Sequence, residues 1–547
     1  MFFISLMLTV LEICAYLRPG VLSFVAARCW LVHSGVYLIS SLYVIYKTLR
    51  QDVLGKNFRG ILVFFLVAWA AFNIAASRGL SINHEGTQQV ADGCAFFKFH
   101  DLNYTKTGFL GYPARQYLLL ALPSLFLGRN LVALRSGFAA AFLLGMMLFY
   151  CGLSRSFEEH KTGRTLLAPL MALSLLCFPF VVNVMVSCEQ SLLPVSFTLQ
   201  AAGWFLLCLK GITPLRAVSL AYIGALLATS YTPGLAPWVL LIVLIGLRIK
   251  QEQRLNSVYP VMLWISVVVF ITVFGAASFF TRTDMFFRQS GVWAPGYSRW
   301  PYLFGTLRAL FIPSCQAFLP LPVVVYIMVS LMKMFHPRDF WISLWAVVTV
   351  FMATQLGGFA SPAPPYSLHR ALVIIPPVLI TLAFTIEPWL VSRRAISSKI
   401  LLLVLCFGIL IPGGNLHESL KLYRSGIRDE VIYNTLDVVD EYGIDPNGRL
   451  RIIVASEHVE YANLYDSYRY FYPKSEFLWG QDTILDAEIA DYPTLVYLDA
   501  ERPPLSVTDM VPGGNTDFSV VKFSFNEQEA QFLRAVYVPA KNIRSVD

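Results

Sequence analysis

Charged side chains are scarce in this sequence. Of its 547 residues, 14% are Asp, Glu, Lys or Arg, whereas globular domains usually carry about 25%. Hydrophobic residues make up 56% and aromatic residues 14%. This composition excludes a disordered chain, a nucleic-acid-binding module and a small disulfide-rich scaffold. It leaves a polytopic α-helical membrane protein, in which the net charge of +8 bears on orientation rather than on nucleic-acid binding.

Cysteine is also sparse, and its spacing indicates no metal site. The nine Cys include no Cys-x-x-Cys pair, and six of them lie inside apolar runs, where Cys behaves as a small hydrophobic residue. Cys94, Cys188 and Cys315 lie in or near the segments predicted below to face outward. A disulfide among these three is compatible with the sequence, but spacing does not establish one.

Long apolar runs are abundant, and a membrane helix needs about 20 such residues. Three of the runs are short, so we expect about 11 to 13 transmembrane helices. The first run has no basic segment before it and no cleavage site after it, so we expect a retained helix rather than a signal peptide. The runs are 2–17, 21–46, 61–77, 132–153, 166–185, 191–209, 217–231, 235–247, 258–280, 312–332, 340–357, 371–386 and 400–412.

The gaps between the runs alternate in charge, which predicts the orientation of the chain. Short basic gaps face the cytoplasm, and every second gap is basic. The basic gaps carry Lys47, Arg50, Lys56 and Arg59; Arg155, Lys161 and Arg164; Lys210 and Arg216; Arg248, Lys250 and Arg254; Lys333 and Arg338; and Arg393, Arg394 and Lys399. The segments predicted to face outward are 78–131, 186–190, 232–234, 281–311, 358–370 and everything after 412.

The tail has a different composition, because the long apolar runs stop at Pro412 and the charged fraction rises. Residues 416–442 have helical spacing, while 451–455 and 494–498 read as short buried strands. We therefore predict a small extracytoplasmic α/β domain over 413–547, which caps the outer face. It follows an N-terminal hairpin with a basic loop (1–60) and a catalytic membrane region (61–412). The tail contains no glycine-rich phosphate loop, no metal-type spacing and no nucleophile elbow.

The largest outer gap contains an ordered series of polar residues. It begins with His84-Glu85-Gly86 just past a membrane run and ends in an apolar stretch at 117–127. If that stretch crossed the membrane, every later basic gap would lie outside. We therefore predict that 117–127 is an interfacial helix on the outer surface.

This gap resembles that of the GT-C glycosyltransferases, which use polyprenyl-phosphate sugars, and in particular the protein-mannosyltransferase and aminoarabinose-transferase branch. In that branch an acidic pair is followed by an aromatic-x-Asp step, a Lys-x-Pro-Gly step, a juxtamembrane helix and an Arg-containing membrane helix. The matching pieces, spread over about 55 residues, are His84-Glu85-Gly86, Phe99-His100-Asp101, Lys106-Thr107-Gly108, Tyr117–Gly128 and Leu134-Arg135.

The resemblance implies roles for several of these residues. His84 replaces the first acid of the pair, so Glu85 becomes the candidate base that takes a proton from the acceptor hydroxyl, with Asp101 as an alternative base or site-lining residue. His84 is expected to support Glu85, and Lys106 to bind the donor phosphate. Solvated loop positions, or a helix-capping role for Glu85, are the alternative interpretations.

A second outer acid, Glu189, lies in a gap of about five residues. The family often carries an acid there that faces the first one across the cavity, although helix capping would also favour an acid at this position. Two carboxylates on one cavity could bind a divalent cation or raise each other's pKa. The sequence does not decide between these, and the family contains both metal-dependent and metal-independent members.

Two late outer gaps supply basic residues for the lipid phosphate. The gap 281–311 places Arg288 among aromatic residues, and 358–370 ends in His369-Arg370 before a membrane run. Arg binds phosphate through a two-pronged donor fork. We expect Arg288 and Arg370 to bind the donor phosphate, with Tyr366 and His369 in support. An aromatic belt with snorkelling Arg is the alternative for 281–311.

The resemblance thus predicts an inverting glycosyltransferase of the inner membrane, with its site on the outer or periplasmic face. Its partners would be a polyprenyl-phosphate sugar donor, membrane lipids and a lipid-linked, polymer or protein acceptor, without nucleic acid. The sugar, hexosyl or pentosyl, is left open, as are the acceptor and the length of the lipid. Two rival interpretations are a transporter or flippase of lipid-linked glycans and an envelope-polysaccharide polymerase or ligase.

Overall fold

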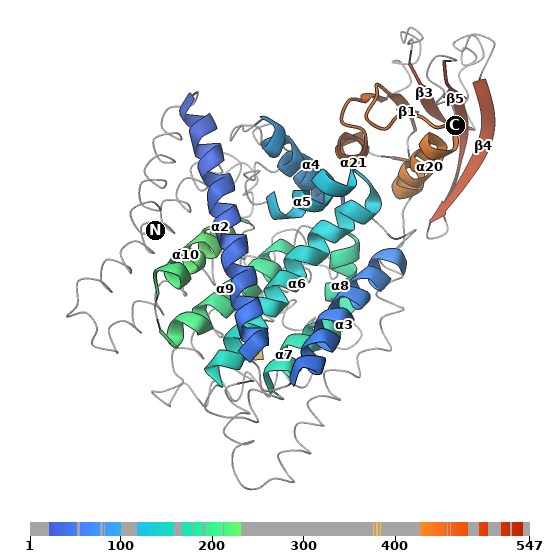
Figure 1. Cartoon of the computed structure of the whole chain (residues 1–547). Helices are drawn as coiled ribbons and strands as arrows, with labels where there is room; N and C mark the ends of the chain where they lie inside the picture. The colour runs from blue at the N-terminus through green and yellow to red at the C-terminus, as the bar shows by residue number, and fades with distance from the viewer. Residues whose placement is uncertain are drawn as a thin grey trace, which may run out of the picture.

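A computed structural model of the chain consists of a helical body and a small α/β domain (Figure 1). All structural statements below concern the residues that it describes. These are 21–51, 55–76, 80, 82–99, 118–157, 167–177, 179–189, 192–211, 213–230, 376, 379, 380, 383, 427–456, 458, 459, 461–479, 492–500, 516–525 and 528–539.

The helical body contains the predicted apolar runs that fall within the described residues. One helix among these residues, α6, is long and apolar enough to cross a membrane by length and composition, and shorter apolar stretches occupy 62–75 and 192–208. The number of membrane crossings stays a prediction. The helices are α2 (Val21–Gln51), α3 (Gly55–Ala76), α4 (His84–Phe99), α5 (Leu118–Leu127), α6 (Leu131–Ser156), α7 (Ala168–Ser174), η4 (Leu175–Cys177), α8 (Pro179–Val186), α9 (Leu192–Leu209) and α10 (Pro214–Ser230).

Helices α6 and α9 pack closely, because glycines on both helices let the backbones approach. A Cβ on Gly152 would lie 2.7 Å from the carbonyl oxygen of Gly203, and one on Gly203 would lie 2.9 Å from the backbone nitrogen of Phe149. Small residues at helix contacts are typical of membrane bundles, where close backbone packing replaces the hydrophobic driving force.

Among the described residues, those of two predicted inner gaps and those of the predicted outer gaps 78–131 and 186–190 lie at opposite ends of the body. At one end Arg155 donates to Gln51, which joins two gaps predicted to be cytoplasmic. At the other end Asn83 donates its backbone N–H to Ser187 O at 2.7 Å, and Tyr470 of the tail donates to Asn130 O at 3.2 Å. This grouping agrees with the charge alternation. Which end faces the cytoplasm stays a prediction.

The tail forms a five-stranded mixed sheet with two helices, α20 (Ile427–Glu441) and α21 (Tyr461–Phe471). The strands lie in the order β2-β1-β3-β5-β4. Strand β1 is parallel to β2 and β3, whereas β5 is antiparallel to β3 and β4. The predicted strands 451–455 and 494–498 are confirmed as the buried β1 and β3. The strands are β1 (Arg451–Ala455), β2 (Glu476–Trp479), β3 (Thr494–Asp499), β4 (Thr516–Phe525) and β5 (Gln528–Tyr537).

A shared hydroxyl network joins the two helices of this domain to its sheet. Thr435 of α20 lies 2.9 Å from both the Tyr468 hydroxyl of α21 and the Tyr497 hydroxyl of β3. All three residues are buried, so each hydroxyl needs a partner to offset the loss of water. The network therefore fixes α20 and α21 on one rigid platform, and Figure 1 shows that platform at the same end of the body as α4 and α5.

Several sequence predictions need correction. The run 166–185 is not one continuous helix, because it is divided into α7, η4 and α8, and α8 begins at Pro179, where Pro is favoured but cannot extend a preceding helix. Helix α4 was not predicted at all. Cys94 and Cys188 are both buried free thiols, so no disulfide joins them, and Cys315 lies outside the described residues. The helix predicted over 117–127 is present as α5.

Candidate active site

The candidate base, Glu85, lies in the first turn of α4. The sequence had placed it in the outer gap just past a membrane run, without a helix. Asn83 caps this helix, because its side-chain Oδ1 accepts from the backbone N–H of Gly86 at 2.9 Å and its carbonyl accepts from that of Thr87 at 3.1 Å. The unpaired N–H groups and the dipole of a helix N-terminus favour a negative charge in this turn. Glu85, whose side chain is half-buried, therefore occupies a position that stabilises its carboxylate.

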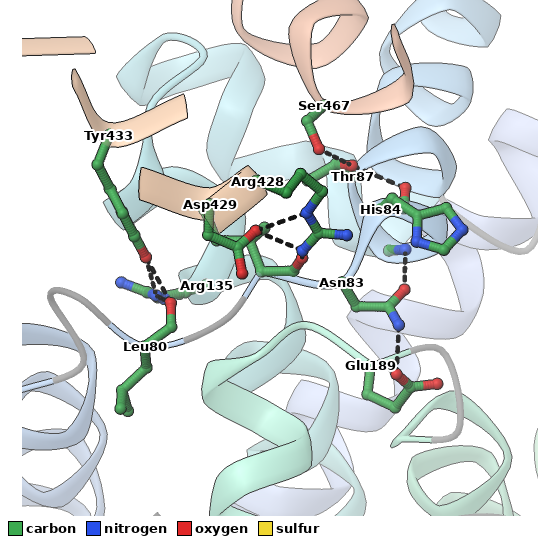
Figure 2. Close-up of polar contacts among 12 residues, drawn as sticks. Leu80, Asn83, His84, Thr87, Arg135, Glu189, Arg428, Asp429, Tyr433 and Ser467 are labelled. Atoms are coloured by element: carbon green, nitrogen blue, oxygen red, sulfur yellow. Dashed lines mark hydrogen bonds and ion pairs between the residues drawn. The ribbon is translucent and has the colours of Figure 1, made fainter. Parts of the chain in front are cut away.

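The short segment that carries Glu189 lies directly against the start of α4. The backbone N–H of Asn83 donates to Ser187 O at 2.7 Å, and its side-chain Nδ2 donates to Glu189 Oε2. Figure 2 shows Glu189 below Asn83, on the side where α4 begins. The structure thus brings the two predicted acids into one region, with Glu189 bonded to the residue two positions before Glu85.

Gly86 makes this approach possible. A Cβ at this position would overlap the carbonyl oxygen of Cys188 and lie 3.0 Å from the carbonyl carbon. Cys188 itself has a φ of 57°, a left-handed conformation that is uncommon for a residue other than Gly. A glycine directly after Glu85 is therefore required by the contact between α4 and the segment 187–189.

His84, expected to support Glu85, begins α4 and is half-buried. Burial, and to a smaller extent the positive charge of Arg428, together lower the pKa of its imidazole to about 4. His84 is therefore neutral near pH 7. It can act on Glu85 through hydrogen bonding or packing, but it brings no positive charge beside the carboxylate.

Two cationic residues hold the segment that leads into α4 (Figure 2). Arg135 of α6, which is 2% exposed, donates from Nε to Val186 O at 2.8 Å and from Nη2 to Leu80 O at 3.4 Å. Arg428 of α20 donates to Ile82 O and pairs with the buried Asp429. The carbonyls just before the candidate base are thus bound from the membrane body on one side and from the α/β domain on the other.

Sequence reasoning missed the residues that the α/β domain contributes. Arg428 and Asp429 lie in the first turn of α20, where charged residues are common, and Tyr433 lies one turn further along the helix. Tyr433 donates to Leu80 O and accepts from Arg135 at 3.2 Å. No local pattern distinguishes these residues from other polar positions of an amphipathic helix. Only their contacts in the folded structure identify them. Tyr433 and Leu80, for example, are 353 residues apart in the sequence.

The middle of α4 is bound to α21 through a buried ion pair. Arg469 Nη2 lies 3.0 Å from Asp92 Oδ1, and Asp466 lies nearby on α21. Burial raises the pKa of Asp92 to about 6, partly opposed by the charge of Arg469, and burial likewise raises the pKa of Asp466 to about 6. These carboxyls therefore pay a desolvation cost when ionised, which makes this contact sensitive to pH.

The remaining predicted site residues lie outside the described residues. They are Asp101, Lys106, Arg288, Tyr366, His369 and Arg370. Within the part of the chain that the structure describes, no group of three or more His, Cys, Asp or Glu residues is arranged to hold a metal ion. The described part of the site consists of Glu85, Glu189, His84 and the residues that fix them.

Comparison with known proteins finds likeness in structure only. No family model and no curated protein matches the sequence. The apo crystal structure of ArnT from Cupriavidus metallidurans matches with a TM-score of 0.50 and 12% identity, over 87% of this chain and 97% of that one. The ArnT structure bound to undecaprenyl phosphate gives 0.49 and 12%, over 86% and 98%.

A third solved structure is more distant. It is the oligosaccharyltransferase from Archaeoglobus fulgidus in complex with Zn and sulfate, with a TM-score of 0.42 and 12% identity over 80% of this chain and 68% of that one. At this identity, the ArnT match shows the fold alone. It confirms the predicted GT-C-like fold, a helix-rich body with a small sheet-containing domain.

Proposed function

We propose that this chain, which has the GT-C fold, is a membrane glycosyltransferase that moves a sugar from a polyprenyl-phosphate donor to an acceptor hydroxyl. The observation that carries the proposal is the seating of the first turn of α4, with Glu85, on the segment of Glu189 beneath the α/β domain. ArnT, whose fold is shared, has also been crystallised with undecaprenyl phosphate. That ligand class agrees with the donor that the sequence motif implies.

The proposed reaction is a single displacement. The Glu85 carboxylate accepts the proton of the acceptor hydroxyl, and the hydroxyl oxygen forms a bond to the anomeric carbon of the sugar. The bond from that carbon to the phosphate oxygen breaks, and polyprenyl phosphate leaves with the electron pair. Attack opposite the leaving group inverts the anomeric configuration. A base within hydrogen-bond reach of the acceptor contributes about 10²–10⁴-fold to such a step.

Glu189 and Asn83 have supporting roles in this proposal. Asn83 caps α4 with its side-chain Oδ1 and its carbonyl oxygen, and it binds Glu189 with its side-chain Nδ2, so it links the segments of the two acids. Glu189 is then available either to orient the acceptor or to share a cation with Glu85. The position of Glu85 at a helix N-terminus favours a negative charge on its side chain, as a base requires.

The leaving phosphate requires positive charge. We assign this role to Lys106, Arg288 and Arg370, with Tyr366 and His369 in support. Asp101 is the alternative base or a site-lining residue. These assignments rest on the sequence motif, since the six residues lie outside the described part of the chain. An inner-membrane location with the site facing the periplasm, based on the charge alternation, belongs to the same proposal.

The proposal can be tested with purified protein in lipid nanodiscs, a pool of radiolabelled polyprenyl-phosphate sugars and an envelope extract as acceptor. Release of polyprenyl phosphate is measured for the wild type, for Glu85→Gln and for Glu441→Gln, which removes an exposed acid at the far end of α20. We expect Glu85→Gln to lower release at least about 100-fold, and Glu441→Gln to match the wild type.

Two results would contradict the proposal. Full release by Glu85→Gln would remove Glu85 as the base. Movement of intact donor between the leaflets of sealed vesicles, without any release of polyprenyl phosphate by the wild type, would instead support a transporter. The anomeric configuration of the product, read by NMR, separately tests inversion.

A further inference from the structure

Helix α20 of the α/β domain binds the segment that leads into α4. Arg428 donates to Ile82 O, and Tyr433 donates to Leu80 O. Ile82 is 1% exposed, so its carbonyl is removed from water and needs a protein donor. The next residue, Asn83, caps the helix that carries Glu85. The α/β domain is therefore in direct contact with the segment that positions the start of α4 and, with it, Glu85.

We propose that Arg428 and Tyr433 are positioning residues for the transfer reaction, which makes the α/β domain a working part of the site rather than a cap. This inference rests on the proposed function for its kinetic consequence, although its structural part stands independently. Neither residue touches the reacting atoms. Each acts through the backbone that sets where α4 begins, and hence where Glu85 lies.

Tyr433 joins the two segments that carry the candidate acids. Its hydroxyl donates to Leu80 O and accepts from Arg135 at 3.2 Å, while Arg135 also donates to Val186 O at 2.8 Å. Val186 precedes the segment of Glu189. Burial raises the pKa of Tyr433 to about 12, so the hydroxyl keeps its proton and remains a donor. One phenol therefore ties the 80–83 segment to α6 and, through Arg135, to the segment of Glu189.

Arg428 is held in a single orientation. Its Nε donates to Asp429 Oδ1 at 2.8 Å, and the Asp429 carboxylate is almost fully buried. The Arg428 Nη2 pairs with the same carboxylate oxygen and also donates to Ile82 O, so the carboxylate fixes the direction of the planar guanidinium. The ion pair with Asp429 thus orients the Arg428 guanidinium so that it donates to Ile82 O.

The second helix of the domain reinforces the same contact. The Thr87 hydroxyl of α4 lies 3.5 Å from the Ser467 hydroxyl of α21, and Asp92 pairs with Arg469. Because the shared network of Thr435, described above, makes α20 and α21 one platform, α4 is held at its start and along its length. A displacement of about 1 Å at a catalytic group can cost about 100-fold in rate, so loss of this support should be measurable.

The test compares Arg428→Ala and Tyr433→Phe with two matched controls. Arg451 pairs with Glu476 at 2.7 Å, and its side chain is 13% exposed against 19% for Arg428. Tyr492 donates to the same Glu476 at 2.6 Å. Arg451→Ala and Tyr492→Phe therefore remove similar interactions from the same domain, away from α4. The full-length protein in nanodiscs is used throughout.

Two measurements are made on each variant. The first is hydrogen–deuterium exchange of the peptide containing the backbone amides of Asn83, Gly86 and Thr87, all three of which are hydrogen-bonded. We expect it to accelerate at least about 10-fold in both test variants and in neither control. The second is the kinetics of polyprenyl-phosphate release. We expect kcat to fall at least 10-fold with a donor KM within about twofold, because position and not binding is lost.

The outcomes separate this inference from the proposed function. Unchanged exchange in both test variants overturns the positioning role. Faster exchange confined to 83–87 in Tyr433→Phe supports it even if the wild type releases no polyprenyl phosphate, a result that would sink only the proposed function. Unchanged kcat in both variants, in an enzyme that Glu85→Gln inactivates, also overturns it. If Arg428→Ala accelerates exchange across β1 and β3, the domain has unfolded and Tyr433→Phe decides.

Discussion

Substitution of Gly86 by Ala offers the sharpest test of the site geometry. The new Cβ would overlap Cys188 O, lie 3.0 Å from Cys188 C and lie 3.2 Å from Phe138 Cζ. Carbon contacts are normally about 3.5–4.0 Å, and neither a backbone carbonyl nor a packed ring yields easily. The start of α4 must therefore move by about 1 Å or more.

That movement has a calculable consequence. The hydrogen bond from the Asn83 N–H to Ser187 O is 2.7 Å long, and an added 1 Å would take it beyond hydrogen-bonding range. We expect kcat to fall about 100-fold, because Glu85 and Glu189 lose their fixed relation. Overpacking costs about 1–3 kcal/mol, partly offset by the better helix propensity of Ala, worth about 1 kcal/mol. The protein should therefore remain folded.

The assay combines the release of polyprenyl phosphate with thermal unfolding and with amide exchange at Asn83. Gly35→Ala in α2 is the matched control, because a Cβ there would meet nothing within 4 Å. This control should retain activity and lose no stability. Wild-type kcat together with unchanged exchange in Gly86→Ala would refute the reasoning, since it would mean that α4 does not rest on Cys188.

Three further predictions concern the contacts around this centre. Asp92→Asn should remove a pH-dependent contribution to the free energy of unfolding, because the pKa of Asp92 is raised from 3.8 to about 6 in the folded protein and its protonated form therefore favours folding. As the pH falls from 8 to 5, the free energy of unfolding of the wild type should rise by about 1.4 kcal/mol relative to the variant. An equal pH dependence of unfolding in the two proteins would contradict this. Asn83→Ala should lower the stability by about 1 kcal/mol through the lost helix cap and should also lower kcat. Glu189→Gln keeps an acceptor for Asn83, so it should lower kcat without changing thermal unfolding. Equal stability of Asn83→Ala and the wild type would count against the capping role. Gly203→Val should lower the unfolding temperature by forcing α6 and α9 apart, as monitored by circular dichroism, and an unchanged temperature would show that this contact is not close.

The fold was predictable to the extent that it depends on local patterns. Strands β1 and β3 were predicted correctly because short apolar runs between polar residues are typical of buried central strands. Strands β4 and β5 mix polar and apolar residues and pair as a hairpin through positions that the sequence does not mark. Helix α4 was missed because its first turn, His84-Glu85-Gly86, reads as a polar loop and its cap depends on a single Asn.

The sequence predicted which acids belong to the site and their order along the chain. It did not predict the contacts that hold these acids in place. The motif placed Glu85 and Glu189, and the structure brings their segments together through Asn83. The contacts of Arg428 and Tyr433 join positions 346 and 353 residues apart, and no periodicity or propensity encodes such pairing. The reason for Gly86 was likewise hidden, because a steric requirement appears only when the opposing backbone of Cys188 is in place.

The dependence of the 80–83 segment on α20 also has a consequence for biogenesis. Ile82 leaves the ribosome 346 residues before Arg428, so the helical body is inserted while Ile82 O and Leu80 O still lack the donors that α20 supplies, although Arg135 of the body already reaches Leu80 O. The site can be completed only after the α/β domain has been synthesised, moved to the same end of the body and docked. A chain released before residue 427 would therefore keep its helices but would lack an assembled site, which delays activity until synthesis is nearly finished.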